Sequence, residues 1–116
     1  MKVYLIMPVR IADPHITALA QAHMECLERE GHEVHYPPRD APQDDPTGQA
    51  ICEVHRRAMQ AADRVDVVWD INSKGSHFDL GMAYALGKPV NPVLCVDSDI
   101  AGKSYWKAVI SPSTTE

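Results

Sequence analysis

Basic residues are scarce in this chain. Lysine and arginine total 11 of 116 residues against 16 acidic ones, and they form no run longer than Arg56-Arg57. The formal net charge is -5. A nucleic acid polymer needs a basic surface along its phosphates, so it is not expected as a partner. A small anionic ligand needs only one or two well-placed cations and is not excluded.

Cysteines are few as well. Cys26, Cys52 and Cys95 are an odd number at wide spacing. They form neither a disulfide framework nor a C-x-x-C pair of the kind that binds zinc or carries redox chemistry. Cys52 and His55 could offer two metal ligands from one helix face, but no further ligands follow at metal spacing. The sequence therefore predicts no metal site and no cofactor.

Long hydrophobic runs are missing too. The apolar start at residues 3–7 is interrupted by Pro8 and is too short for a signal sequence or a membrane span. We therefore expect a cytoplasmic protein with no membrane partner. At 45% hydrophobic and 23% charged residues, residues 1–116 fit a single domain with one core. The tail from about residue 111 is expected to be loose.

What the chain does contain is an alternation of strand and helix patterns. Short apolar runs predict strands at residues 3–7, 33–36, 64–69 and 89–96. Helical spacing of apolar residues predicts helices at residues 14–30, 47–62 and 77–86. Residues 37–48 hold four prolines and are expected to form a loop, and residues 103–110 fit either a short helix or a fifth strand.

This alternation predicts an α/β fold. We expect a flavodoxin-like, doubly wound parallel sheet of four or five strands in three layers. The strands at residues 3–7 and 64–69 should lie side by side at its centre, because both are short and apolar. Ligands of such sheets bind outside the carboxyl ends of the strands. Those ends carry residues 8–10, 70–76 and 97–99, so polar candidates cluster where this fold binds ligands.

The segment 73–79 leads from a strand into a helix. Gly75 permits a sharp turn, Ser76 can cap the helix, and the free amides of a helix N-terminus favour an anion. Lys74 and the hydroxyls of Ser73 and Ser76 suit a phosphate in the same loop. These residues are candidates for binding a phosphate or carboxylate.

Asp79 has two interpretations that need not exclude each other. Ser76-x-x-Asp79 resembles a capping box, in which Asp79 bonds the backbone amide of Ser76. A carboxylate in the first helical turn would also be held ionised, as a nucleophile at a sugar carbon requires. His77 lies in the same turn, and a contact with a ligand and a purely structural role are equally open for it.

The remaining histidines and tryptophans have ordinary structural interpretations. His23, near the apolar stripe of the first helix, is expected to be a packing or surface residue. His35 flanks a strand and is expected to serve structure. Trp69 ends a strand and could stack on a base or belong to the core.

Residues 75–90, GSHFDLGMAYALGKPV, resemble the signature of the nucleoside 2-deoxyribosyltransferase superfamily. The resemblance extends to Tyr4 and to Ala62-Asp63, and so covers about residues 1–96. It implies that the chain cleaves or transfers the N-glycosidic bond of a (deoxy)nucleoside or nucleoside 5′-monophosphate. By the same resemblance, Asp79 is the carboxylate nucleophile and Tyr4 orients it.

Further roles follow from the same resemblance. Arg10 and Ser73 fall on positions that bind phosphate in the nucleoside 5′-monophosphate N-glycosidases of this superfamily. His55 stands where the family has an aspartate beside the sugar and base, so it offers a titratable donor in place of a fixed acceptor. A protonated His55 or His77 would assist the departure of the base.

The nucleophile position also departs from the family, which has glutamate where this chain has Asp79. The shorter side chain retreats by about 1 Å, and misplacement of that order can cost about 100-fold in rate. Together the two departures leave an alternative open, namely a catalytically inactive nucleotide-binding module. The sequence decides neither the base, nor ribose against deoxyribose, nor hydrolysis against transfer.

A homo-oligomer, most simply a homodimer, is the last expectation. Family members lend C-terminal residues to a neighbour's pocket, and the matching stretch here is residues 102–107. The predicted helix 47–62 also carries apolar side chains round much of its surface. They are Ala50, Ile51, Val54, Ala58, Met59 and Ala61. These are more apolar side chains than one contact with the sheet needs, and a second copy could cover the remainder through a two-fold contact.

Overall fold

The structure is a computed structural model that describes residues 1–10, 13–42, 44–95 and 105–110. Its strands are β1 (Lys2–Ile6), β2 (Glu33–His35), β3 (Arg64–Trp69) and β4 (Val90–Cys95). Its helices are α1 (Pro14–Arg29), α2 (Pro37–Asp40), α3 (Gln49–Ala61), α4 (Lys74–Ala85) and α5 (Tyr105–Ile110). The segment that fitted a short helix or a fifth strand is thus a helix over residues 105–110, whereas 103–104 and the tail from 111 lie outside the described residues.

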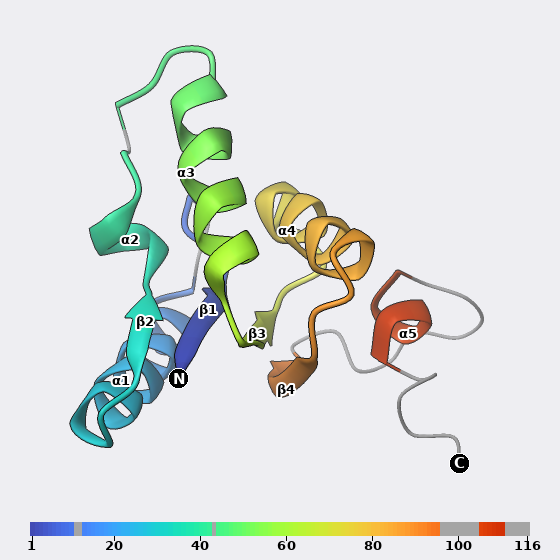
Figure 1. Cartoon of the computed structure of the whole chain (residues 1–116). Coiled ribbons are helices and arrows are strands. Elements are labelled where there is room, and N and C mark those ends of the chain that lie inside the picture. The colour runs from blue at the N-terminus through green and yellow to red at the C-terminus, as the bar shows by residue number, and fades with distance from the viewer. Residues whose placement is uncertain (11–12, 43, 96–104, 111–116) are drawn as a thin grey trace.

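The four strands form one parallel sheet in the order β2-β1-β3-β4. Figure 1 shows the helices on both sides of this sheet. β1 and β3 are adjacent at the centre, with Tyr4 opposite Val65 and Ile6 opposite Val67. The predicted fold class is confirmed. The central position of these strands follows from their burial, since four of the five β1 residues and five of the six β3 residues are buried.

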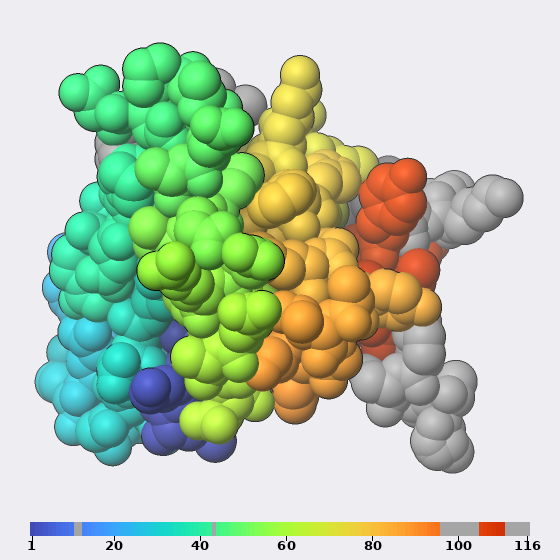
Figure 2. All heavy atoms as spheres, turned by 45° about the horizontal axis from the view of Figure 1, so that its top comes forward, coloured from blue at the N-terminus to red at the C-terminus, as the bar shows by residue number. Residues whose placement is uncertain are grey.

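The two faces of the sheet carry separate apolar clusters. Val3 and Leu5 of β1 point toward α1, where they pack with Met24 and Leu27. Tyr4 and Ile6 alternate with them and point to the opposite face. That second face is covered by side chains of α3, α4 and α5, including Met59, Leu80 and Trp106. Figure 2 shows α3, in green, and α4, in yellow, side by side on one face of the molecule.

Local signals set most element boundaries. Asp13 accepts the His15 amide at 2.8 Å as the N-cap of α1, and Pro14 occupies the first helical turn. Gly31 follows with φ +96°. Residues 37–48 were expected to form a loop, but they contain the short helix α2, which corrects that prediction. Consecutive prolines suit a first helical turn, and the Asp40 carboxylate accepts the Tyr36 amide at 2.8 Å.

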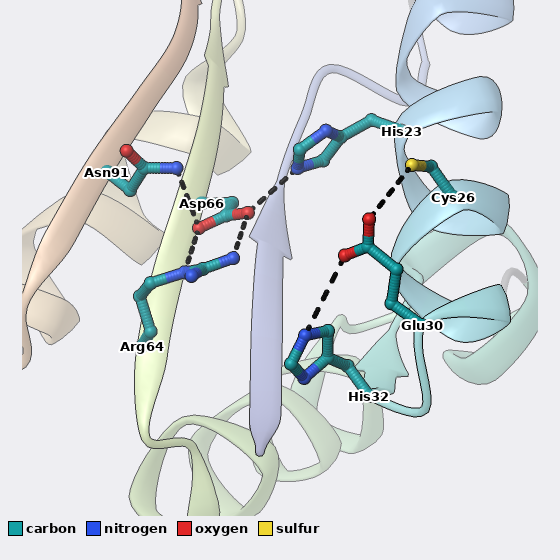
Figure 3. Close-up of polar contacts among 7 residues, drawn as sticks. All are labelled: His23, Cys26, Glu30, His32, Arg64, Asp66 and Asn91. Atoms are coloured by element: carbon teal, nitrogen blue, oxygen red, sulfur yellow. Dashed lines mark hydrogen bonds and ion pairs between the residues drawn. The ribbon is translucent and has the colours of Figure 1, made fainter.

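A buried ionic network links α1 to β3 and β4. Asp66 of β3 is fully buried on the α1 face of the sheet. Its carboxylate accepts hydrogen bonds from Arg64 at 2.6 and 2.9 Å, His23 at 2.8 Å and Asn91 at 3.2 Å (Figure 3). Burial raises the pKa of Asp66, but the bonds from Arg64, His23 and Asn91 outweigh it and hold that pKa below its usual range. His23 is therefore part of an ion network rather than a simple packing residue.

None of the helices in the described part of the chain has the length and apolarity that a membrane crossing needs.

Candidate active site

The centre of the candidate site is a contact between β1 and α4. Tyr4 is fully buried at the middle of the sheet, and its hydroxyl donates to Asp79 Oδ2 at 3.0 Å. Asp79 is only 7% exposed. Parallel strands end at the same edge of a sheet, so β1, β3 and the helix after β3 deliver these groups to one place.

The start of α4 explains why Asp79 faces inward. Ser73 is the N-cap and accepts the Ser76 amide at 3.2 Å, and the Ser76 hydroxyl donates to Ser73 Oγ at 2.9 Å. The helix therefore begins at Lys74, three residues before the predicted start at His77. This places Asp79 in the second turn, so the capping-box interpretation of Ser76 and Asp79 is wrong.

Burial dominates the electrostatics of Asp79. Desolvation raises its pKa to about 7, and the hydrogen bond from Tyr4 offsets only part of that rise. Asp79 was expected to be held ionised in the first helical turn. That expectation is wrong, because the carboxylate lies deeper in the protein than the helix end. Burial and the Asp79 charge raise the pKa of Tyr4, so the phenol stays a neutral donor.

Two histidines form the wall beside Tyr4. His35 of β2 is paired in register with Tyr4 of β1, and α3 brings His55 onto the same face. His35 Nε2 and His55 Nδ1 lie 3.0 Å apart. Burial lowers the pKa of His55 to about 4, with a further contribution from His35. His55 is therefore neutral near pH 7, which disfavours its expected role as a protonated donor.

His35 is a residue that the sequence interpretation missed, since it was expected only to serve structure. Its ring centroid lies 4.9 Å from that of Tyr4. The signal that could have found it is register: a side chain opposite Tyr4 on a neighbouring parallel strand must share the face of Tyr4. Register is not readable from a single strand, so position 35 alone gave no such hint.

An aromatic group adjoins the start of α4. His77 Nδ1 donates to the Ser73 carbonyl oxygen at 2.9 Å, so in the neutral ring Nε2 is an acceptor. The His77 ring lies 4.7 Å from Trp69, which stacks on Trp106 of α5 at 5.2 Å. Trp69 thus belongs to the core at 1% exposure. Its Nε1 is buried and has no hydrogen-bond partner in the described structure.

The remaining predicted residues lie at the rim. Arg10 follows β1 and is exposed, as are Lys74 and Gly75 in the first turn of α4. Within the described residues, no contact joins the Arg10 side chain to the serine pair Ser73 and Ser76. The structure therefore brings Tyr4, His55 and Asp79 together, and it places the serines and His77 at the adjacent helix start.

No group of three or more His, Cys, Asp or Glu side chains within residues 1–10, 13–42, 44–95 and 105–110 could hold a metal ion. The groups that the described residues bring to this site are a buried carboxylate, a phenol, neutral imidazoles and a serine-capped helix start.

Comparisons with known proteins identify the family and the fold. The sequence model of the family described as nucleoside 2-deoxyribosyltransferase matches residues 3–104. The fold resembles that of the CMP N-glycosidase BcmB of Clostridium botulinum, with a TM-score of 0.66, 18% identity, and coverage of 96% of this chain and 81% of that one. It also resembles that of a 2-deoxyribosyltransferase of Bacillus psychrosaccharolyticus, with a TM-score of 0.65, 19% identity, and coverage of 95% and 91%. No curated protein matches the sequence.

Proposed function

Because the chain belongs to the nucleoside 2-deoxyribosyltransferase family, we propose that it cleaves or transfers the N-glycosidic bond of a (deoxy)nucleoside or nucleoside 5′-monophosphate. The observation that carries the proposal is the 3.0 Å hydrogen bond from the Tyr4 hydroxyl to Asp79 Oδ2. It fixes a buried carboxylate at the ligand-binding edge of a parallel sheet. The two similar folds support the same chemistry, since one is a CMP N-glycosidase and the other a 2-deoxyribosyltransferase.

The reaction is a double displacement. An ionised Asp79 oxygen attacks C1′ of the sugar while the C1′–N bond breaks, and the base leaves with the bonding electron pair and takes up a proton. The oxygen of a water molecule, or a nitrogen of a second base, then attacks C1′ and loses its proton to solvent, while the C1′–O bond of the glycosyl ester breaks and restores the carboxylate. Since His55 is neutral near pH 7 and the Nδ1 hydrogen of neutral His77 is already donated to the Ser73 carbonyl oxygen, water is the better source of the proton.

A phosphate on the substrate would lie at the start of α4. The amides of the first turn and the exposed Lys74 favour an anion there, and Ser73 Oγ keeps a hydrogen to donate because both of its described bonds are accepted. Arg10 follows the neighbouring strand and lies at the same edge of the sheet. These groups favour a nucleoside 5′-monophosphate over the nucleoside.

A panel of nucleosides and 5′-monophosphates, followed by chromatography for free base, tests the function. We expect free base, with kcat/KM about 10-fold higher for the monophosphate, and Arg10→Ala should remove that advantage, because a charged hydrogen bond contributes about 1.5–3 kcal/mol. Arg57→Ala, at an exposed arginine of α3, is the matched control and should change nothing. Equal binding of nucleoside and monophosphate at low salt would contradict the phosphate site.

The alternative is a nucleotide-binding module without turnover. It is favoured by one observation: burial raises the pKa of Asp79 to about 7, so the ionised nucleophile is harder to form at neutral pH than it would be on an exposed aspartate. The same panel separates the two functions. Saturable binding of a nucleotide with no free base after prolonged incubation at pH 8 would establish the module and refute the enzyme.

The protein should also assemble as a homo-oligomer, most simply a dimer. Met59 of α3 is buried in the core, so this helix leaves fewer apolar side chains for a partner than predicted. The neighbouring α4 instead exposes Phe78 at 54% and Tyr84 at 68%. A second copy over the α3 and α4 surface would remove these side chains from water. Of the stretch expected to reach a partner's pocket, residues 102–104 lie outside the described part.

Sedimentation velocity at micromolar concentration should give twice the chain mass of 12.9 kDa. Phe78→Glu should shift the mass to the monomer, because it places a charge in the apolar contact. Leu19→Glu, at a 40% exposed position of α1, is the control and should leave the dimer intact. A monomeric native protein with undiminished nucleotide binding would contradict the shared site.

A further inference from the structure

Two histidines from different elements form a pair beside the carboxylate. His35 Nε2 and His55 Nδ1 lie 3.0 Å apart, and the rings meet nearly at right angles, at 84°. The Tyr4 ring lies 4.9 Å from His35 and 5.8 Å from His55. Since the Tyr4 hydroxyl also donates to Asp79, Tyr4 links the pair to the proposed nucleophile.

The pair depends on the tertiary fold. Tyr4 and His35 are opposite each other in the register of β1 and β2, so both side chains point to the face that α3 covers. His55 comes from the middle of α3, 20 residues along the chain. The orientation of the His55 ring is therefore tied to the edge strand β2 by one hydrogen bond.

Both rings are neutral near pH 7. Burial lowers the pKa of His55 to about 4, and the neighbouring His35 lowers it further. Burial also lowers the pKa of His35, against a smaller rise caused by Asp40 and together with a further lowering by Arg39. A hydrogen bond between two neutral imidazoles needs one donor and one acceptor. One ring must therefore donate its N–H to the nitrogen lone pair of the other.

The identity of the two nitrogens indicates the direction. A neutral histidine in water carries its proton mainly on Nε2. Donation from His35 Nε2 to His55 Nδ1 keeps both rings in that favoured form, whereas the reverse direction would require both to carry the proton on Nδ1. His35 is then the donor, and His55 keeps a hydrogen on Nε2.

We propose that His35 is a positioning residue that holds His55 as a neutral hydrogen-bond donor, through Nε2, for an acceptor atom of the leaving base. This rests on the proposed function. Each common nucleobase carries an acceptor next to the glycosidic nitrogen, O2 in pyrimidines and N3 in adenine and guanine. A donor at that atom stabilises the charge that the base gains as the C1′–N bond breaks. A carboxylate, the residue type that the resemblance places at position 55, can only accept once it is ionised.

Nitrogen-15 NMR of the imidazole rings at pH 7 tests the pairing without any substrate. We expect a protonated Nε2 and a bare Nδ1 in His55. His35→Phe keeps a ring against Tyr4 but removes the donor, so His55 should lose its single tautomer. His35→Gln, whose amide nitrogen reaches about as far as Nε2, should restore it. A proton on His55 Nδ1 in the native protein, or an unchanged spectrum in His35→Phe, would overturn the proposal.

Kinetics test the donor role. His35→Phe should lower kcat/KM about 10-fold, mainly through kcat, because one hydrogen bond to the leaving base is weakened. His35→Gln should recover most of that loss, and equal rates in the two variants would overturn the proposal. If no nucleotide is cleaved at all, the proposed function fails, and the NMR result still decides whether His35 positions His55.

Discussion

Asp79→Asn should lower the turnover of any cleaved nucleotide by at least about 10³-fold. The amide has no charge with which to form the glycosyl ester. It keeps the size of the side chain, and its carbonyl oxygen can still accept the hydrogen bond that Tyr4 donates at 3.0 Å. A loss of rate in this variant therefore reports the missing carboxylate rather than a disturbed fold, and release of free base measures it.

Two further substitutions sharpen that result. Asp79→Glu should cost about 100-fold, because a site built round Asp misplaces the longer carboxylate by about 1 Å. Tyr4→Phe should cost about 10-fold, because it removes one hydrogen bond and leaves the nucleophile in place. If Asp79→Asn turned over nucleotide at the native rate, the carboxylate would not be the nucleophile.

The same Asp79→Asn variant should be more stable than the native protein at high pH. The pKa of Asp79 is about 7 in the folded protein against 3.8 ordinarily, so the folded state binds the proton more tightly than the unfolded state. Native stability must then fall as the pH rises from about 4 to about 7, by up to about 4 kcal/mol. The amide carries no charge at any of these pH values and avoids this loss.

Urea unfolding at pH 5 and pH 8 measures the effect. The advantage of Asp79→Asn should be less than half of its full value at pH 5 and close to its full value at pH 8. Asp44→Asn changes an exposed carboxylate in the segment before α3 and should follow the native curve at both pH values. An advantage of equal size at pH 5 and pH 8 would show that burial of the charge is not its cause.

Asp66→Ala should destabilise the protein by about 3–5 kcal/mol. The change leaves the Arg64 guanidinium, 30% exposed, and the ring of His23 without the carboxylate that binds both. It also removes the hydrogen bond between His23 Nε2 of α1 and Asp66 Oδ2 of β3, which links the two elements. The midpoint of urea unfolding should fall accordingly at pH 7.

Controls separate the buried network from ordinary surface pairs. Asp66→Asn keeps the shape and one acceptor, so it should lose less stability than the alanine. Glu53→Ala breaks the exposed pairs with Arg56 and Arg57 on α3 and should leave the midpoint unchanged. If both alanine variants unfolded at the same urea concentration, the Asp66 network would contribute nothing to stability.

The sequence determined the architecture because each element carries its own local signal. The apolar runs at β1 and β3 predicted a sheet covered on both faces, and Asp13-Pro14 predicted the start of α1. It also identified the segment that becomes the start of α4, together with Tyr4 and Asp79. Their meeting at one edge followed from the parallel topology and not from any distance in the chain.

The boundary of α4 shows where local reasoning fails. Ser73 and Ser76 are both good caps by residue type, and the choice between them moves Asp79 by one turn of helix. Only Ser76 was expected to cap the helix. In the structure Ser73 takes the cap position, and Ser76 bonds to it from inside the helix.

Only the tertiary structure decided the chemical state of the site. The pKa of Asp79 and of His55 depends on how much water each side chain loses, and burial is a property of all the elements packed around it. The pairing of His35 with His55, and of Asp66 with His23, likewise joins residues 20 and 43 positions apart through strand register and helix packing. Residue type and spacing along one element carry no information about which neighbour that packing supplies.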